Sequence, residues 1–133
     1  MKIVQLNTHV AVSEQLACDD LPAIAAAGYK VVVNNRPDGE VPGQPTNAEI
    51  EQAALAAGLQ YHYLPITATS FPGSEPETMR ALFDDSDNPV LAFCRTGTRC
   101  ANLWVSSRTE TDRSDAYSVA LSLGYDLALA KAN

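Results

Sequence analysis

Residues 89–105 read PVLAFCRTGTRCANLWV, and this stretch joins a short apolar segment, a polar loop and an amphipathic segment. The apolar residues 89–93 are too few for a typical helix, which predicts a short buried strand. Residues 94–100 contain a glycine and two arginines and predict a loop, and the apolar positions after them predict a helix. A strand that passes through a short polar loop into a helix is typical of α/β proteins, in which ligands bind at the carboxyl ends of strands.

The rest of the chain repeats this alternation of strands and helices. The predicted strands are residues 3–6, 10–13, 30–34, 59–66 and 89–93. The predicted helices are residues 21–28, 46–58, a segment from Ser74 or Glu75 to 84, one through 101–105, and a last one from Ser114. The core positions expected in that last helix are Val119, Leu121, Leu123, Leu127 and Leu129. We therefore expect the α/β class: one three-layer domain over residues 1–133, with a mostly parallel central sheet flanked by helices.

The composition narrows the possible partners. The 133 residues are 46% hydrophobic with a net charge of −7, which suits a globular domain and argues against binding to nucleic acid or to an anionic membrane. No apolar run approaches the roughly 20 residues of a membrane span, and the first residues lack the apolar core of a signal peptide, so a cytoplasmic location is expected. Three cysteines are too few for a disulfide framework, and no motif predicts a metal or another cofactor.

Cys94 is the candidate nucleophile. The thiolate is the reactive form of cysteine, and a helix N-terminus and a nearby arginine both lower the pKa of a thiol. The backbone N–H groups of Thr96, Gly97 and Thr98 can form a nest for an anion. Arg99 can hold two oxygens of that anion with its planar guanidinium. The loop therefore predicts a cysteine nucleophile that forms a covalent intermediate with a small anionic substrate.

Two further arginines are candidates for substrate binding. Arg95 lies within the loop and is expected to point outward, toward substrate or solvent. Arg36 follows a predicted strand at the same edge of the sheet, so it either adds a cation to the site or pairs with Asp38 or Glu40. Together with the acidic net charge, these arginines predict a small cationic pocket inside an acidic surface.

Three segments together resemble a known family. Residues 93–99 (FCRTGTR), residues 31–40 (VVVNNRPDGE) and the turn at residues 43–45 (GQP) are similar to the phosphatase-like domain of bacterial beta-lactamase hydrolase-like proteins. The resemblance runs over most of the chain. It implies a fold like that of dual-specificity and tyrosine phosphatases, with Cys94 as nucleophile, Arg99 as anion binder and a phosphomonoester as substrate.

The loop departs from the tyrosine phosphatase pattern, in which five residues separate the cysteine from the arginine. Four residues separate Cys94 from Arg99, which is the spacing of rhodanese-type sulfurtransferases that carry a persulfide on cysteine. Phe93 stands where the phosphatases have a histidine, and Cys100 stands where they have serine or threonine. The sequence therefore leaves open hydrolysis of a phosphate ester, sulfur transfer from a sulfane sulfur donor, and an inactive domain that only binds anions.

Two roles in the reaction remain to be assigned. Cys100 is either a second thiol that resolves an oxidised or persulfidated Cys94, or a residue that packs in the first helical turn. The general acid of a phosphatase is not evident, since residues 67–74 contain no aspartate. Asp38 is the candidate, with Glu40 as another, although both residue types are also common in solvated turns.

Overall fold

The computed structural model describes residues 1–131. Its strands are β1 (Ile3–Gln5), β2 (Val10–Ser13), β3 (Val31–Asn34), β4 (Gln60–Tyr63) and β5 (Val90–Phe93). Its helices are the 3-10 turn η1 (Cys18–Asp20), α1 (Leu21–Ala26), α2 (Asn47–Ala56), α3 (Pro76–Asp84), α4 (Thr98–Ser106), α5 (Arg113–Ser122) and α6 (Ala128–Lys131). Within this range, no helix has the length and hydropathy of a membrane span.

β5 lies in the middle of a sheet with the order β1-β2-β5-β3-β4. Among the strands of residues 1–131, only β1 runs antiparallel to its neighbour, so the predicted mostly parallel α/β fold is confirmed. The ladders align Phe93 with Ser13 of β2 and with Asn34 of β3. The segments that follow these three strands therefore emerge together at one edge of the sheet, and Cys94 is the first residue after β5.

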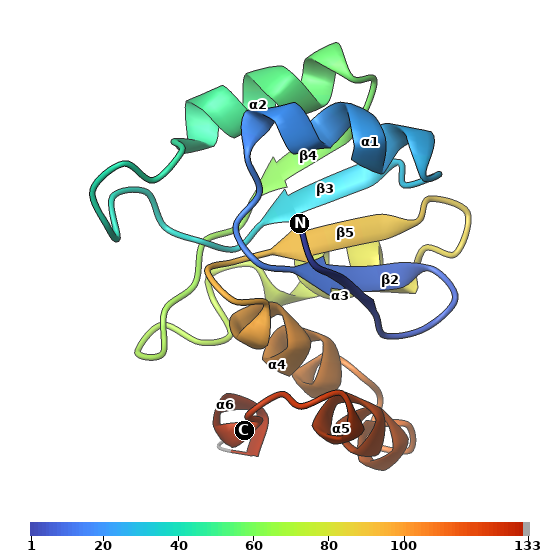
Figure 1. Ribbon diagram of the computed structural model, residues 1–133. Helices are drawn as coiled ribbons and strands as arrows, with labels where there is room; N and C mark the ends of the chain where they lie inside the picture. Colours follow the sequence, from blue (N-terminus) through green and yellow to red (C-terminus); the bar gives the residue numbers. More distant parts are fainter. Residues whose placement is uncertain (132–133) are drawn as a thin grey trace.

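Helices cover both faces of the sheet, as predicted for three layers (Figure 1). α1 and α2 lie on one face, and the four helices from α3 to α6 lie on the other. Leu91 and Phe93 belong to the core beneath α1 and α2, whereas Val90 and Ala92 belong to the core beneath α3 and α4. Successive strand residues point to opposite faces, and both faces are covered, so the apolar run of β5 has no polar side.

α4 begins earlier than the sequence predicts. Thr98 is its first residue, so Arg99 and Cys100 both lie in the first helical turn. The N–H of Ala101 donates to the Gly97 carbonyl at 3.0 Å and starts the helical hydrogen bonding. Only residues 95–97 therefore separate Cys94 from the helix.

The last predicted helix is two helices, and part of its predicted core is wrong. The exposed positions are Val119, Leu121 and Leu123. Ala116 and Ala120 are buried in their place, because small side chains allow α5 to pack closely against α4. Leu127, which lies before α6, is buried as predicted.

Candidate active site

The loop after β5 is held tightly against the end of β2. The N–H of Cys94 donates to the Ser13 carbonyl at 3.3 Å. Gly97 has a φ of 90°, in the left-handed region that strains residues with a side chain. A Cβ on Gly97 would lie 3.4 Å from the Tyr125 hydroxyl and 3.5 Å from the Ser13 backbone. Glycine therefore fits both the backbone angle and the narrow space at this turn.

The sulfur of Cys94 lies inside a ring of hydrogen-bond donors. The N–H of Gly97 donates to Cys94 Sγ at 3.1 Å. The largest influence on the Cys94 pKa is the hydrogen bond with the Cys100 side chain; burial opposes it, and the N–H groups of Cys100, Thr96 and Arg99 add to it. Together they lower the Cys94 pKa to about 5. At neutral pH, Cys94 is therefore a buried thiolate, the nucleophilic form of cysteine.

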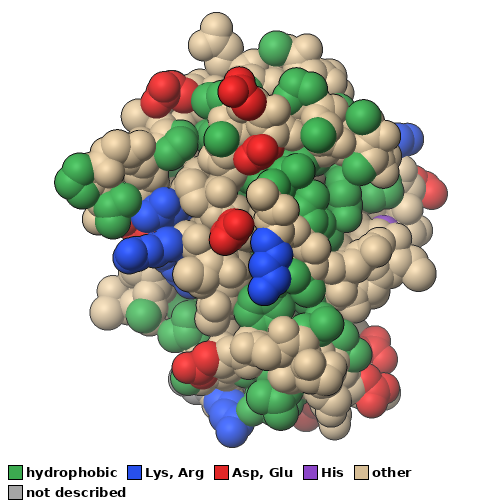
Figure 2. Space-filling view, in the orientation of Figure 1, with side chains coloured by type: hydrophobic (Ala, Val, Ile, Leu, Met, Phe, Trp, Pro, Cys, Tyr) green, Lys and Arg blue, Asp and Glu red, His purple; other side chains and the backbone are tan. Residues whose placement is uncertain are grey.

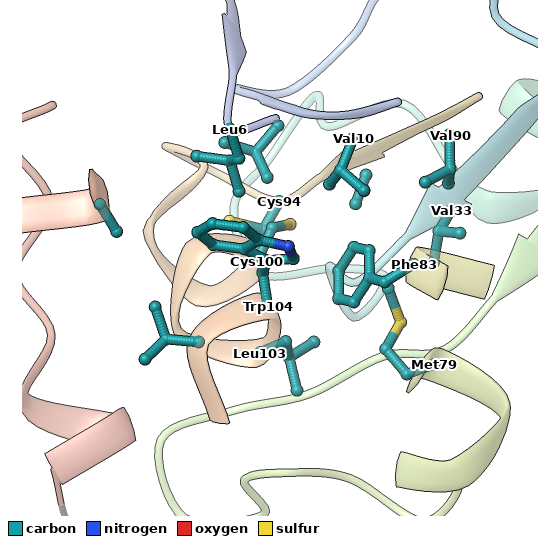
Figure 3. Close-up of a cluster of buried hydrophobic side chains, with 14 of the residues drawn as sticks. Leu6, Val10, Val33, Met79, Phe83, Val90, Cys94, Cys100, Leu103 and Trp104 are labelled. Atoms are coloured by element: carbon teal, nitrogen blue, oxygen red, sulfur yellow. The ribbon is translucent and has the colours of Figure 1, made fainter. Parts of the chain in front are cut away.

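Cys100 is the second thiol of the site. It is fully buried, and its single thiol hydrogen has two acceptors within reach, Asn35 Oδ1 at 3.2 Å and the Cys94 sulfur. Burial, followed by the interaction with Cys94, raises the pKa of Cys100 well above its ordinary value. Figure 3 shows the two cysteines together beside Trp104 in the buried cluster. The structure therefore brings the predicted second thiol next to Cys94 in its protonated form.

Arg99 is held by a carboxylate from a distant part of the chain. Its Nη2 lies 2.8 Å from Glu40 Oε1, and its Nη1 lies 3.0 Å from Glu40 Oε2. Nη1 also donates to the Ile66 carbonyl at 3.0 Å. The hydrogen bond between the two side chains raises the pKa of Arg99 and lowers the pKa of Glu40. A bidentate pair of this kind fixes the plane of the guanidinium.

Arg36 takes the second of its two predicted roles. Its Nε lies 2.9 Å from Glu40 Oε1, and its Nη1 donates to Gln15 Oε1 at 2.9 Å. Only 3% of Arg36 is exposed, so it pairs with Glu40 inside the protein and presents no free cation to solvent. The predicted cationic pocket therefore contains a carboxylate between its two paired arginines. Lys and Arg side chains gather at the left of Figure 2, where β3 and β5 end in the matching view of Figure 1.

The other loop residues face either the Cys94 sulfur or the solvent. The side chain of Arg95 is exposed, as expected. Thr96 Oγ1 donates to Thr98 Oγ1 at 3.0 Å, so the two hydroxyls bind each other at the start of α4. The N–H groups of Thr96 and Gly97 face Cys94 Sγ. The loop therefore offers backbone donors to an anion and leaves Arg95 for contacts outside the loop.

Asp38, the candidate general acid, is hydrogen-bonded to other parts of the chain. Its carboxylate accepts a hydrogen bond from the N–H of Asn47 at 2.7 Å, at the N-terminus of α2. Its own N–H donates to the Tyr63 hydroxyl at 3.1 Å. Both bonds stabilise the loop between β3 and α2, which is an ordinary use of aspartate in a turn.

Two supporting residues escaped the sequence analysis. Asn35 Oδ1 is one of two acceptors for the Cys100 thiol, and Gln15 receives a hydrogen bond from Arg36. Their position in the sequence could have indicated them, since each is a polar residue just beyond the carboxyl end of a buried strand.

This arrangement suits nucleophilic attack on a small anionic substrate. A buried thiolate with N–H donors and a guanidinium beside it can attack a small oxyanion and hold the negative charge that develops. Within residues 1–131, no three His, Cys, Asp or Glu side chains are grouped to hold a metal ion.

Comparison with known families gives one match over most of the chain. The family described as beta-lactamase hydrolase-like protein, phosphatase-like domain, matches residues 2–111. A beta-lactamase hydrolase-like protein of Agrobacterium fabrum is 33% identical over 98% of this chain, and one of Xylella fastidiosa strain Temecula1 is also 33% identical over 98%. The chain spans 31% of the length of each of these relatives.

Solved structures resemble the fold over the whole chain. The crystal structure of a proposed phosphatase of Neisseria meningitidis is 36% identical, with a TM-score of 0.79 over 100% of this chain and 99% of that one. Kinase associated phosphatase, solved with its catalytic-site cysteine replaced by serine, is 12% identical with a TM-score of 0.70, over 97% of this chain and 87% of that one. Tk-PTP in its active form is 21% identical with a TM-score of 0.68, over 90% of this chain and 82% of that one. The last two show the fold alone, and the predicted phosphatase-like fold is confirmed.

Proposed function

Since the chain belongs to the phosphatase-like domain family of beta-lactamase hydrolase-like proteins, we propose that it hydrolyses phosphomonoesters through a covalent intermediate on Cys94. The observation that carries the proposal is the Cys94 thiolate, which lies in a ring of N–H donors with its pKa lowered to about 5. The N–H groups and Arg99 would hold the phosphate oxygens, as in other sites where fixed donors stabilise a transferred phosphoryl group.

The reaction has two steps. In the first, Cys94 Sγ attacks phosphorus, the bond to the leaving oxygen breaks, and that oxygen departs with the bonding electron pair. In the second, water attacks the phosphocysteine, inorganic phosphate is released, and Cys94 returns to the thiolate. A thiolate with a low pKa is a good leaving group, so the same donor ring that activates Cys94 favours the second step.

The direct test measures phosphate release and the covalent intermediate together. Purified protein is offered an aryl phosphate, and the reaction is quenched in acid for mass analysis. We expect one phosphate to be released for each aryl phosphate consumed. We also expect a phosphoryl group on Cys94 in the quenched sample. Release of phosphate with no phosphoryl group on Cys94, and with full activity in Cys94→Ser, would contradict the mechanism.

Asp38→Asn tests the candidate general acid. We expect kcat/KM for an aryl phosphate within about twofold of the wild type, because the Asp38 side chain binds α2 and an amide oxygen can accept the same hydrogen bond. A general acid contributes about 10²- to 10⁴-fold, so its removal would be unmistakable. A loss of that size, together with loss of the alkaline limb of the pH profile, would assign the acid to Asp38.

Glu40→Gln tests whether the Glu40 carboxylate positions Arg99. We expect kcat/KM to fall about tenfold, because the amide keeps the shape of Glu40 but loses its charge toward both arginines. Glu40→Asp should recover part of the loss, since the carboxylate returns one methylene shorter. If Glu40→Gln lowers the melting temperature without changing kcat/KM at a temperature where it is folded, Glu40 serves stability alone.

Sulfur transfer is the second candidate, and the length of the loop favours it. Four residues lie between Cys94 and Arg99, and the sulfur accepts a hydrogen bond from Gly97, so the ring of donors is small. A persulfide needs less room than a tetrahedral phosphate. The two candidates separate in one side-by-side assay, in which the protein receives either an aryl phosphate or thiosulfate with cyanide. Thiocyanate formation with one extra sulfur atom on Cys94, and no phosphate release, would replace the phosphatase proposal.

A further inference from the structure

A surface hollow with a volume of about 390 Å³ lies between α4, α5 and α6. Both α5 and α6 pack against α4 (Figure 1). The wall of the hollow carries two basic side chains, Arg113 and Lys131, and two hydroxyls, those of Ser114 and Ser118. The rest of the wall is apolar or aromatic, and no acidic side chain of residues 1–131 lines it. The hollow therefore suits a negatively charged ligand.

Arg113 is a partly buried cation without an acidic partner. Its Nη2 donates to the Arg108 carbonyl at 3.3 Å, which holds the guanidinium in place. Its Nε is buried and has no hydrogen-bond partner in the described part of the chain. The salt bridges within residues 1–131 involve Arg36, Arg99 and Arg108, and none involves Arg113. Charged groups that are removed from water are usually paired, so this guanidinium can accept an anion that the described residues do not supply.

Lys131 brings a second positive charge to the same hollow. Its Nζ lies 5.6 Å from the centre of the Tyr117 ring. The side-chain hydrogen bond with Tyr117 has the largest influence on the Lys131 pKa and raises it, whereas the charge of Asp126 has the smallest. Two of the nine basic residues in a chain of net charge −7 therefore line one hollow. No carboxylate of the described residues lies between them, in contrast to Glu40 beside Arg99.

We propose that this hollow binds a small organic phosphate, with the phosphate group against Arg113 and Lys131 and the organic part against Val105 and Tyr117. Two cations match the double negative charge of a phosphate group, and a planar guanidinium can donate to two of its oxygens. A phosphate group alone does not fill a hollow of about 390 Å³. The apolar part of the wall therefore has room for the organic part of the ligand.

This site is separate from the candidate active site. Arg99 lies in the first turn of α4, and Val105 lies six residues further along the same helix, which corresponds to about 9 Å of helix rise. No residue of the loop at positions 94–100 lines the hollow. Binding there does not depend on the proposed reaction at Cys94.

The test follows backbone amide resonances of the isotope-labelled protein during titration with phenylphosphonate. This probe has a doubly charged group on an apolar ring, and it has no ester bond that the protein could hydrolyse. We expect saturable shifts at residues 113–118 and at Lys131. Shifts at residues 94–100 would report binding at the candidate active site separately, with their own dissociation constant. Inorganic phosphate and benzoate, which lack the ring and the second charge respectively, should each bind at residues 113–118 at least about tenfold more weakly.

Two variants test the cations of the hollow. Arg113→Gln and Lys131→Gln should each weaken phenylphosphonate binding at residues 113–118 by at least about tenfold, because each removes a charged donor. Arg80→Gln, which removes an exposed charge from α3, is the matched control and should leave this affinity unchanged. The exposed side chain of Lys131 keeps the test decisive even if Arg113→Gln failed to fold.

The two sets of resonances also separate this proposal from the proposed function. Shifts confined to residues 94–100, or equal affinity of the wild type and Lys131→Gln at residues 113–118, would overturn the phosphate site and leave the proposed function intact. Binding at residues 113–118 in a protein without phosphatase activity would support the site and count against only the proposed function.

Discussion

Cys94→Ser is expected to lower kcat/KM for an aryl phosphate by at least about 10³-fold, because the serine hydroxyl is not ionised in the site and cannot serve as the nucleophile. The backbone donors and Arg99 remain, so the variant should still bind inorganic phosphate. Phosphate release at constant enzyme concentration and phosphate binding by calorimetry check the two halves of this result. Cys18→Ser, whose sulfur lies beside α2, is the control and should keep full activity.

The same variant isolates the ionisation of Cys94. The pKa of this thiol is lowered to about 5, first by its hydrogen bond with the Cys100 side chain and then, against burial, by backbone N–H groups. A lowered pKa means that the thiolate is present above pH about 5 and is lost as the pH falls through that value. The ultraviolet absorbance of the wild type minus that of Cys94→Ser should therefore titrate with a midpoint near pH 5. A midpoint near the ordinary value for cysteine would contradict the activated thiolate.

Arg99→Lys is expected to lower kcat/KM by about 10²- to 10³-fold, although it keeps the positive charge. Lysine has a single ammonium group, so it cannot bind Glu40 and present a planar pair of donors to a phosphate at the same time. Arg99→Ala should be at least as damaging. Steady-state kinetics over a range of aryl phosphate concentrations separates the loss in kcat from the loss in KM.

The control for Arg99 is an arginine on another helix. Arg80→Ala removes an exposed charge from α3 and should leave both constants unchanged. If Arg99→Lys also retains wild-type kinetics, the guanidinium is not the clamp on the transferred group. The pairing of Arg99 with Glu40 would then be a structural ion pair only.

The pairing of Arg99 with Glu40 also affects which anions the site can bind. The sequence predicts a cationic pocket within a chain of net charge −7. In the structure, Glu40 lies between Arg99 and Arg36, so much of that positive charge is already balanced. The donors that remain for an anion are mostly backbone N–H groups. Such a site favours a small group that enters the ring over a long polyanion that contacts a charged surface.

The sequence by itself determined the central part of the fold and the nucleophile. A four-residue apolar strand, a polar loop with Gly97 and an amphipathic helix are local patterns, because strand burial, turn geometry and helix periodicity depend on nearby residues. Cys94 follows from these patterns, since the end of a central parallel strand is where ligands bind. The mostly parallel sheet and its two covered faces follow from the same alternation of strands and helices.

The tertiary structure alone decided the partners of the charged and thiol groups. Glu40 lies 59 positions from Arg99 in the sequence, and no local pattern predicts which of 16 acidic residues would meet that guanidinium. The sequence could not choose between the two roles of Arg36, because the choice depends on how the loop after β3 folds against β5. It also could not place Cys100 beside Cys94, since this needed α4 to begin at Thr98. Hydrogen bonds and ion pairs act over a few ångströms, so the packing of segments far apart in the chain had to bring these atoms together.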